Sequence, residues 1–332
     1  MSNPGGTSTR DPVFVVGMNG SGTTMLADSL GRHPGLYMLP LESKVLPYYL
    51  GRFGAAGQLD SLAARRQLAD RIGGTKAFWQ SNGKQPLKVP DEALEAEGFA
   101  GVLDALYGTL ATAQGKRRWG DKSPINTWCV QALADAIPEA RFIHIVRDGR
   151  DAAQSFHRRW GYEPRHTIWR WRDAVTTASE AGQRLGPARY VELRYEALTA
   201  QPETHMRALC DFLGLPFDRA VLESSMRYMD PANEQAGQGR IIENSGKWAT
   251  YFSAADIASL ERIAGRCLAE HGYAVSDGGG EAVPSPLRRR WWRFRDAVMF
   301  TASFFREYGW RGIGMYGRLG ANALRQRIAR KT

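Results

Sequence analysis

The sequence predicts an α/β protein with three layers, in which helices flank a mostly parallel β-sheet. Short apolar runs rich in β-branched residues, typical of strands buried on both faces, recur along the chain. Segments with the apolar spacing of helices separate these runs, as expected for parallel strands joined by helical crossovers. The composition, with 43% hydrophobic and 11% aromatic residues, excludes a disordered or fibrous chain.

The expected elements alternate along the chain. The first strand is a continuous apolar run at 13–16, which leads through a glycine-rich turn at 17–22 into a helix that ends near Gly31 and Pro34. Residues 73–90 are rich in Gly, Lys and Pro and are expected to form a loop. The other strands are expected at 36–39, 142–146 and 190–193, and the other helices near 58–72, 91–113, 125–136, 151–159, 202–213 and 254–271.

Charge and composition divide the chain into four parts. They are a polar leader at 1–11, a domain at 12–275, a Gly- and Pro-rich linker at 276–286 and a basic aromatic amphipathic tail at 287–332. The tail holds 12 basic and two acidic residues, so it carries the whole net charge of +10 and the rest of the chain is neutral. Because a nucleic-acid-binding domain carries its basic residues on the fold itself, no nucleic-acid partner is expected.

Cysteine content and hydropathy bear on the compartment. Cys129, Cys210 and Cys267 lie far apart and form neither a C-x-x-C pair nor an even-numbered disulfide framework. The leader lacks the apolar core of a signal peptide, and no run of 18 apolar residues could span a bilayer. These observations favour a cytoplasmic protein.

Residues 17–24, Gly-Met-Asn-Gly-Ser-Gly-Thr-Thr, have the setting of a phosphate-binding loop. They lie between a buried strand and a helix, where glycines let backbone N–H groups turn toward an anion. The loop is not a Walker A motif, because Thr23 stands where the lysine that serves the β- and γ-phosphates would be. A dinucleotide G-x-G-x-x-G pattern is also absent, and Asn19 excludes a G-x-S-x-G serine-hydrolase turn. An ordinary tight strand–helix turn is the alternative.

A phosphate loop without that lysine resembles the loop of sulfotransferases that use 3′-phosphoadenosine-5′-phosphosulfate (PAPS). Residues 21–24, Ser-Gly-Thr-Thr, are similar to the second half of the family's P-[RK]-S-G-T-[TS] loop. The strand at 142–146, followed by Arg147 and by Ser155 eight residues later, is similar to the family's 3′-phosphate motif. Arg147 offers a bidentate fork of N–H donors at the end of a strand, and Ser155 adds a hydroxyl from the next helix.

The resemblance covers about residues 12–275 and is closest to the tyrosylprotein sulfotransferases and their bacterial relatives. Residues 42–47 look like their E-T-R-[VI]-I-P segment, and residues 147–150 match their R-D-G-R. Residues 190–213 resemble their [RH]-Y-E-x-L turn and F-L-G helix, and residues 246–248 look like their S-K-W. The resemblance implies a P-loop-NTPase-like sulfotransferase fold and transfer of the sulfuryl group from PAPS to an acceptor hydroxyl, with PAP as the product.

Three residues are candidates for catalysis. Glu42 corresponds to the family's proposed catalytic base, and it follows the second strand at the edge where open α/β sheets bind ligands. Lys122 resembles the lysine of the family's K-[DST]-P motif and would stabilise the sulfuryl oxygens or the leaving phosphate oxygen. Lys44 would contact the acceptor or polarise Glu42. The alternatives are a solvated Glu42 paired with Lys44, and a Lys122 paired with Asp121.

The resemblance also implies which residues hold PAPS. Arg159 and Tyr195 would help to hold the nucleotide, and Lys247 would reach its 3′-phosphate. Gly20 departs from the family, which has Arg or Lys at this position, so Lys122, Lys44 or backbone N–H groups would have to stabilise the leaving group. The full set of PAPS-binding candidates is Gly20, Ser21, Gly22, Thr23, Thr24, Arg147, Ser155, Arg159, Tyr195 and Lys247.

The expected reaction is direct in-line transfer with no covalent enzyme intermediate and no metal. The six histidines show no ligand spacing such as H-E-x-x-H. The acceptor hydroxyl would belong to a peptide tyrosine or to a saccharide or glycolipid, and its choice would be made in loops such as 73–90 and 160–170. A non-catalytic nucleotide- or phosphate-binding module of the same fold is the alternative, and a P-loop kinase is a less favoured one.

In the tail, one helical face gathers apolar and aromatic residues beside arginines. One interpretation is a helix that lies on an anionic membrane surface, which would place the protein at the membrane periphery. The second is a C-terminal helix docked on the sulfotransferase core, and the third is docking of an anionic polymer. The residues of this face are Trp291, Phe294, Val298, Ala302 and Phe305.

Overall fold

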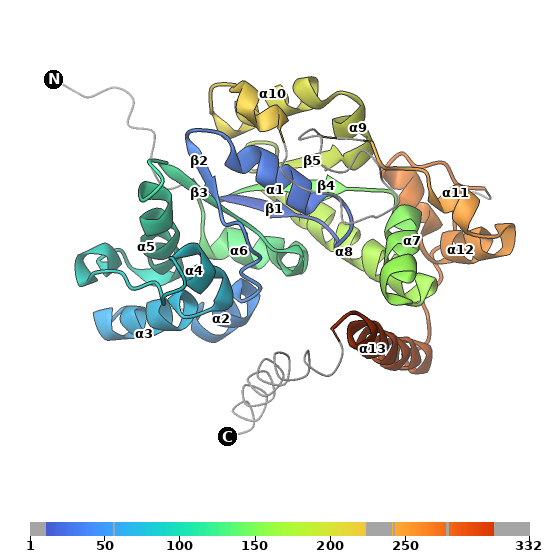
Figure 1. The fold of residues 1–332 in the computed structure, drawn as a ribbon, viewed down its shortest axis with the longest axis horizontal. Coiled ribbons are helices and arrows are strands. Elements are labelled where there is room, and N and C mark those ends of the chain that lie inside the picture. Colours follow the sequence, from blue (N-terminus) through green and yellow to red (C-terminus); the bar gives the residue numbers. More distant parts are fainter. Residues whose placement is uncertain (1–10, 56, 224–240, 242, 277–278, 309–332) are drawn as a thin grey trace. The chain divides into compact units, whose positions relative to one another are not determined.

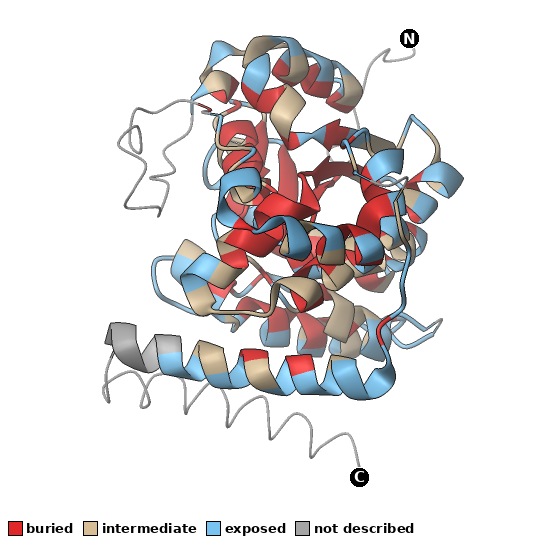
Figure 2. Ribbon diagram, turned by 90° about the vertical axis from the view of Figure 1, so that its right-hand side faces the viewer, coloured by how far each residue is buried: buried red, intermediate tan, exposed pale blue. Residues whose placement is uncertain are grey.

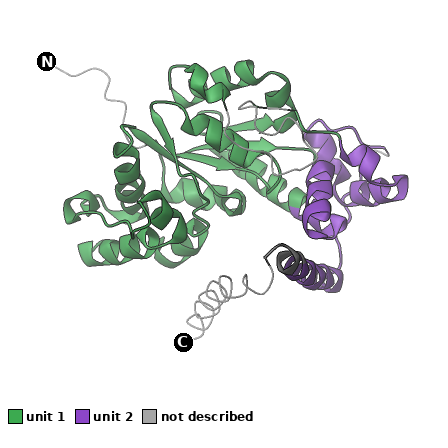
Figure 3. Cartoon of the chain, in the orientation of Figure 1, with its two compact units in different colours: residues 1–148, 171–246 green, residues 149–170, 247–332 purple. Residues whose placement is uncertain are grey.

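The computed structural model describes residues 11–55, 57–223, 241, 243–276 and 279–308, with side chains up to residue 302. Two compact units are formed, and Figure 3 shows them in different colours. The first unit comprises residues within 1–148 and 171–246, and the second comprises residues within 149–170 and 247–332. Each unit is described separately below.

The first unit is built on a parallel sheet of five strands, in the order β2-β3-β1-β4-β5 (Figure 1). Val15 of β1 pairs with Lys122 of β3, and Val16 pairs with His144 of β4. All strands run the same way, so their carboxyl ends meet at one edge. The strands are β1 Val13–Val16, β2 Leu36–Met38, β3 Arg118–Lys122, β4 Arg141–Val146 and β5 Tyr190–Arg194.

Helices cover both faces of the sheet, which confirms the predicted three-layer α/β class. Alternate side chains of β1 point to opposite faces: Phe14 and Val16 join one core, and Val13 and Val15 join the other. Figure 2 shows these strands among the buried residues. The helices of this unit are α1 Thr23–Gly31, α2 Leu46–Phe53, α3 Leu62–Gly73, α4 Lys76–Ser81, α5 Gly98–Thr112, α6 Val130–Ala136, most of α8 Pro164–Leu185, α9 Tyr195–Ala200 and α10 Pro202–Leu213, with 3₁₀ turns at Asp91–Leu94, Pro124–Cys129 and Arg219–Leu222.

Strand β3 was not predicted, because its sequence Arg-Trp-Gly-Asp-Lys does not read as an apolar run. All five residues are nevertheless buried, and hydrogen bonds satisfy several of their side-chain polar groups. Arg118 Nε donates to the main-chain oxygen of Asp11 at 2.8 Å, and Trp119 Nε1 donates to Asp104 Oδ1 at 2.8 Å. A polar sequence can therefore form an interior strand when hydrogen bonds offset the burial of its polar groups.

Several predicted boundaries were wrong for local reasons. The helix expected at 58–72 begins at Leu62, because the Ser61 hydroxyl accepts from Ala64 N at 3.2 Å and caps it. The helix expected at 91–113 is a 3₁₀ turn followed by α5, whose first residue, Gly98, has a positive φ. The expected loops at 73–90 and 160–170 contain α4 and the start of α8.

The second unit is made of helices. They are α7 Gly149–Trp160, the first turns of α8, α11 Trp248–Tyr251, α12 Ala254–Glu270 and α13 Pro286–Tyr308. Arg150 on α7 donates to Glu261 Oε1 on α12 at 2.6 Å, and both side chains are buried. The Arg150 guanidinium also lies 3.7 Å from the Trp248 ring centroid. These contacts join α7, α11 and α12 within this unit.

Candidate active site

The glycine loop, residues 17–22, connects β1 to α1 as expected. Gly17 N donates to Thr127 Oγ1 at 2.8 Å, and Ser21 N donates to Met18 O at 3.0 Å. Gly20 and Gly22 have φ of 86° and 91°, where glycine avoids the steric cost that other residues meet. In the described part of the chain, Gly22 at the N-cap of α1 makes no side-chain cap hydrogen bond, so the first backbone N–H groups of this helix lack a side-chain cap.

Ser21 carries a buried hydroxyl directly before α1. Its side chain is 1% exposed, and its Oγ has no hydrogen-bond partner among the described residues. A buried hydroxyl of this kind costs free energy unless a ligand or water completes its bonding. An uncapped helix N-terminus beside an unsatisfied donor fits a phosphate or sulfate group.

The glycine loop also contacts the ends of β4 and β5. Arg147 follows β4, and its Nη1 donates to Gly20 O at 3.0 Å, while its Nη2 donates to Asn244 O. The Arg147 guanidinium lies 4.8 Å from the ring centroid of Tyr195, the first residue of α9. A Cβ at Gly22 would lie 2.5 Å from Tyr195 Cδ2, so only glycine lets the ring approach this closely. Four of the predicted PAPS-binding residues therefore lie together.

Thr24, Glu42, Lys44 and Lys122 form a second group, the charged cluster. Lys122 is the last residue of β3 and is 4% exposed, and its Nζ donates to Glu42 Oε1 at 3.0 Å and to Thr24 Oγ1 at 3.1 Å. Lys44 Nζ lies 3.1 Å from Glu42 Oε2. Each oxygen of the Glu42 carboxylate thus faces one ammonium group, so Glu42, whose side chain is 22% exposed, is not paired with Lys44 alone.

The charged cluster sets the protonation state of Glu42. Burial by itself would raise the pKa of this carboxyl, but the charges of Lys122 and Lys44 and their hydrogen bonds outweigh burial, and the pKa is lowered. Glu42 is therefore ionised at neutral pH. An ionised carboxylate can accept a proton from a hydroxyl that is placed beside it.

A buried polar network, which the sequence did not reveal, lies behind the charged cluster. Asp121 accepts hydrogen bonds from Tyr107 Oη at 2.9 Å and from Asn126 Nδ2 at 2.9 Å, and burial raises its pKa. Ser43 Oγ and Ser123 Oγ lie 3.1 Å apart and join the segments that carry Glu42 and Lys122. Asp121 is thus held mainly by these neutral donors, while Lys122 is directed to Glu42.

The segment after β2 has an unusual backbone. Lys44 has a φ of 58°, a left-handed conformation that is uncommon for a residue with a side chain. Its N–H donates to Ser123 Oγ at 3.2 Å, which helps to hold this conformation. The turn places Lys44 Nζ next to Glu42, although Lys44 is 70% exposed.

Ser155, Arg159 and Lys247 belong to the second unit. Ser155 and Arg159 lie on α7, and the Arg159 guanidinium is 4.8 Å from the Trp160 ring centroid. Lys247 precedes α11, and its main-chain oxygen accepts from Thr250 Oγ1 at 3.3 Å. Their predicted roles at the nucleotide stay predictions.

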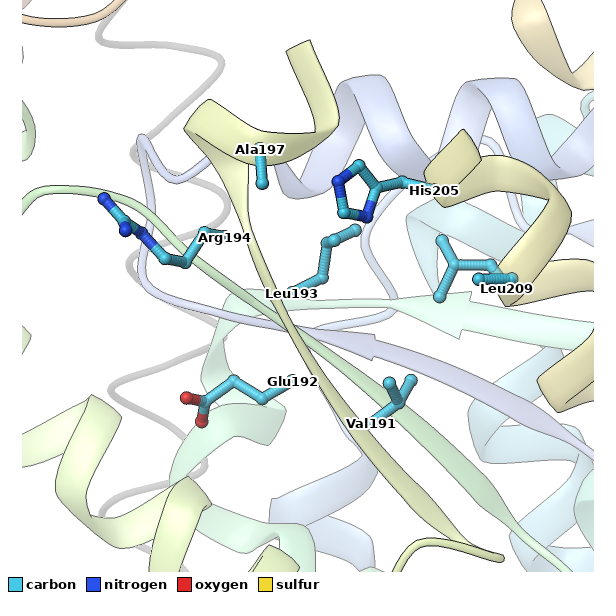
Figure 4. A pocket seen from close by; sticks show the side chains of 8 residues that line it. Val191, Glu192, Leu193, Arg194, Ala197, His205 and Leu209 are labelled. Atoms are coloured by element: carbon cyan, nitrogen blue, oxygen red, sulfur yellow. The ribbon is translucent and has the colours of Figure 1, made fainter. Parts of the chain in front are cut away.

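A cavity of about 210 Å³ lies beside β5 and involves other residues. Figure 4 shows Leu193, Ala197, His205 and Leu209 gathered on one side of the strand, between β5 and the helices α9 and α10. No predicted catalytic or PAPS-binding residue lines this cavity. The candidate active site is instead the carboxyl edge of the sheet, where the glycine loop and the charged cluster lie.

A parallel sheet with a phosphate-type loop at its carboxyl edge defines an α/β enzyme class that handles phosphate or sulfate esters. Residues 12–219 match the family model described as the sulfotransferase family, and the chain therefore belongs to the sulfotransferase family. This confirms the predicted membership of the PAPS-dependent sulfotransferase superfamily.

Individual relatives agree with this family. The chain is 21% identical over 280 residues to protein-tyrosine sulfotransferase A of Caenorhabditis elegans, covering 79% of this chain and 67% of that protein. It is 26% identical over 223 residues to protein-tyrosine sulfotransferase 1 of Danio rerio, covering 63% of this chain and 55% of that protein. The sulfotransferase domain of the Synechococcus PCC 7002 olefin synthase has a similar fold, with a TM-score of 0.53, 24% identity and coverage of 80% of this chain and 97% of that domain.

Potential metal ligands are scattered in the described ranges. Among those residues, no three His, Cys, Asp or Glu side chains gather in a way that could hold a metal ion. The metal-free reaction stays a prediction.

Proposed function

We propose that this protein transfers the sulfuryl group from PAPS to an acceptor hydroxyl, with Glu42 as the base. The observation that carries the proposal is that two features lie at one edge of the sheet. The first is the glycine loop with the uncapped N-terminus of α1, which fits an anion, and the second is the ionised Glu42 carboxylate between two lysines. Bound PAPS would supply a sulfuryl group, whose bond to the 5′-phosphate oxygen breaks as sulfur bonds to the acceptor oxygen, leaving PAP.

The glycine loop would hold the phosphosulfate end of PAPS. Backbone N–H groups at the start of α1 and the Ser21 hydroxyl are the donors that this role requires. Thr23 and Thr24 begin α1, and Thr24 Oγ1 already contacts Lys122 Nζ. Arg147, at the end of β4 beside Tyr195, would bind the 3′-phosphate through its guanidinium fork. The nucleotide roles of Ser155, Arg159 and Lys247, which the family resemblance implies, stay predictions.

Glu42 would accept the proton of the acceptor hydroxyl. Its lowered pKa keeps it ionised, and donor binding would change its environment, because the same Lys122 Nζ that pairs with Glu42 would also face an anionic donor. A lysine drawn toward the donor leaves Glu42 a stronger base. Lys122 would thereby stabilise charge on the sulfuryl oxygens or the leaving oxygen. It would take over this role from the Arg or Lys that the family has at the position of Gly20.

The acceptor class follows from the relatives only in part. The names of the relatives favour a peptide tyrosine, and a saccharide or glycolipid hydroxyl is the second candidate.

Purified full-length protein should be incubated with ³⁵S-labelled PAPS and a panel of tyrosyl peptides, oligosaccharides and glycolipids. Mass spectrometry should show the gain of one sulfate on one class. The alternative of a non-catalytic module would be supported if PAP binds in calorimetry and no acceptor gains sulfate, and hydrolysis of ATP would favour a kinase.

A further inference from the structure

Helix α13 presents an exposed apolar face. Leu287, Trp291, Phe294 and Val298 are spaced by four, three and four residues, which places them on one side of a helix. Their exposed fractions are 78%, 61%, 63% and 49%. Exposed apolar residues grouped in this way mark an interaction surface. Figure 2 shows the exposed and buried residues of this helix.

The other face of α13 is fixed within the second unit. Trp292 and Asp296 are 5% and 7% exposed, and Asp296 Oδ2 lies 2.6 Å from Nδ1 of the buried His166. Asp296 Oδ1 also accepts from Glu163 N at 2.8 Å. These contacts hold the helix against the start of α8 and leave the Trp291 side outward. Within the described part of the second unit, one face of α13 is thus packed and the opposite face is uncovered.

The exposed side of α13 carries only positive charge in its described part. Arg288, Arg290 and Arg293 are exposed. The one acidic residue between 286 and 302 is Asp296, which is buried against His166. An apolar stripe with tryptophan, bordered by arginines, has the chemistry of a helix that lies in an anionic lipid interface.

We propose that the exposed face of α13 binds an anionic membrane surface. The helix would lie parallel to the membrane, with Trp291 and Phe294 at the boundary of headgroups and acyl chains and the arginines at anionic headgroups. No helix among the described residues is long and apolar enough to cross a bilayer. A second copy of the chain fits this face less well, because a two-fold pairing would bring arginines against arginines.

Vesicle binding of the full-length protein tests this proposal. Co-sedimentation should be measured with phosphatidylcholine vesicles and with vesicles that also contain phosphatidylglycerol, and binding should require the anionic lipid. Trp291→Ser with Phe294→Ser should weaken binding on the order of 100-fold, because two exposed rings lose their insertion. Arg290→Gln with Arg293→Gln should weaken binding roughly 10-fold to 30-fold. Val283→Ser, which alters a residue that is 71% exposed outside α13, should bind as the wild type does.

Three outcomes would overturn the proposal. They are no binding to anionic vesicles, equal binding to neutral and anionic vesicles, and equal binding by the wild type and the Trp291/Phe294 variant. Sedimentation velocity should be run on the same variants. A loss of oligomers in the Trp291/Phe294 variant with unchanged vesicle binding would assign this face to contact between copies instead.

Discussion

The charged cluster of Thr24, Glu42, Lys44 and Lys122 and the glycine loop beside Arg147 lie at the same edge of one sheet, yet different forces hold them. In the charged cluster, two lysines surround one carboxylate, with N–O distances of 3.0 and 3.1 Å. At the glycine loop, Arg147 donates to a main-chain oxygen, and the Tyr195 ring fills the space where Gly22 has no Cβ.

This difference predicts how the charged cluster and the glycine loop each respond to substitutions and to pH. Charge and pH should control the charged cluster, because its geometry depends on ionised groups. Side-chain volume and backbone conformation should control the glycine loop. Substitutions matched for chemistry or for φ can separate the two kinds of effect.

The largest effect is expected for Lys122→Met. This change removes the ammonium that links Glu42 to Thr24, and it should lower kcat/KM by about 10²–10³-fold, as the loss of one transition-state charge contact does. Steady-state transfer assays would measure it. Arg117→Met alters an exposed basic residue next to the amino end of β3, outside the segments assigned to the acceptor, and should keep the wild-type rate. An equal loss of kcat/KM in both variants would contradict the role of Lys122 in stabilising charge during transfer.

Gly22→Ala should damage the glycine loop through volume. Its Cβ would meet the Tyr195 ring at 2.5 Å, and overpacking of this kind costs about 1–3 kcal/mol in the free energy of unfolding. PAP affinity, measured by calorimetry, should fall as well. Gly83→Ala is the matched control, because Gly83 also has a positive φ but no atom within 4 Å of its Cβ position. The account of the loop fails if both variants lose the same stability.

Gly20→Arg restores the residue type of the family and should still reduce transfer. Gly20 has a φ of 86°, where a side chain costs about 1–2 kcal/mol, and its main-chain oxygen accepts from Arg147. The KM for PAPS would therefore rise. Faster transfer by this variant would show that the loop was not built around glycine.

The smallest effect concerns pH. Glu42 must be ionised to accept a proton, so kcat/KM should fall as pH drops through its pKa, which is lowered below the ordinary value. Lys44→Met removes one of the charges that lower this pKa, and the acid limb of the pH profile should move to higher pH. Lys84→Met is the control, because Lys84 also has a positive φ and is exposed. If the acid limb of the pH profile stays at the wild-type pH in the Lys44→Met variant, the pairing of Lys44 with Glu42 is contradicted.

The sequence predicted the fold where apolar runs mark strands, which are buried in β1 and β4 and largely half-buried or exposed in β5. The runs at 13–16, 142–146 and 190–193 became β1, β4 and β5, and the glycine loop follows β1 as expected. Strand β3 was not predicted, because its burial depends on hydrogen bonds to distant groups such as Asp104 and the main chain of Asp11. Such partners have no signal in a local pattern.

The sequence predicted candidate residues for the site but not the contacts among them. The family motifs pointed to Glu42 and Lys122 separately, and their pairing needs the order β2-β3-β1, which could not be derived without β3. The network of Asp121, Tyr107 and Ser123 was missed for the same reason. The predicted tail face extends to Phe305, whose side chain lies outside the described residues.

The most direct test of the central claim compares transfer with binding in Glu42→Gln. PAP affinity should be measured by calorimetry, and transfer of labelled sulfate from PAPS should be measured on the same preparation. The account predicts wild-type PAP affinity with kcat lower by about 10²–10⁴-fold, because the variant keeps the shape of the side chain and loses the base. Transfer by Glu42→Gln at the wild-type rate would contradict it.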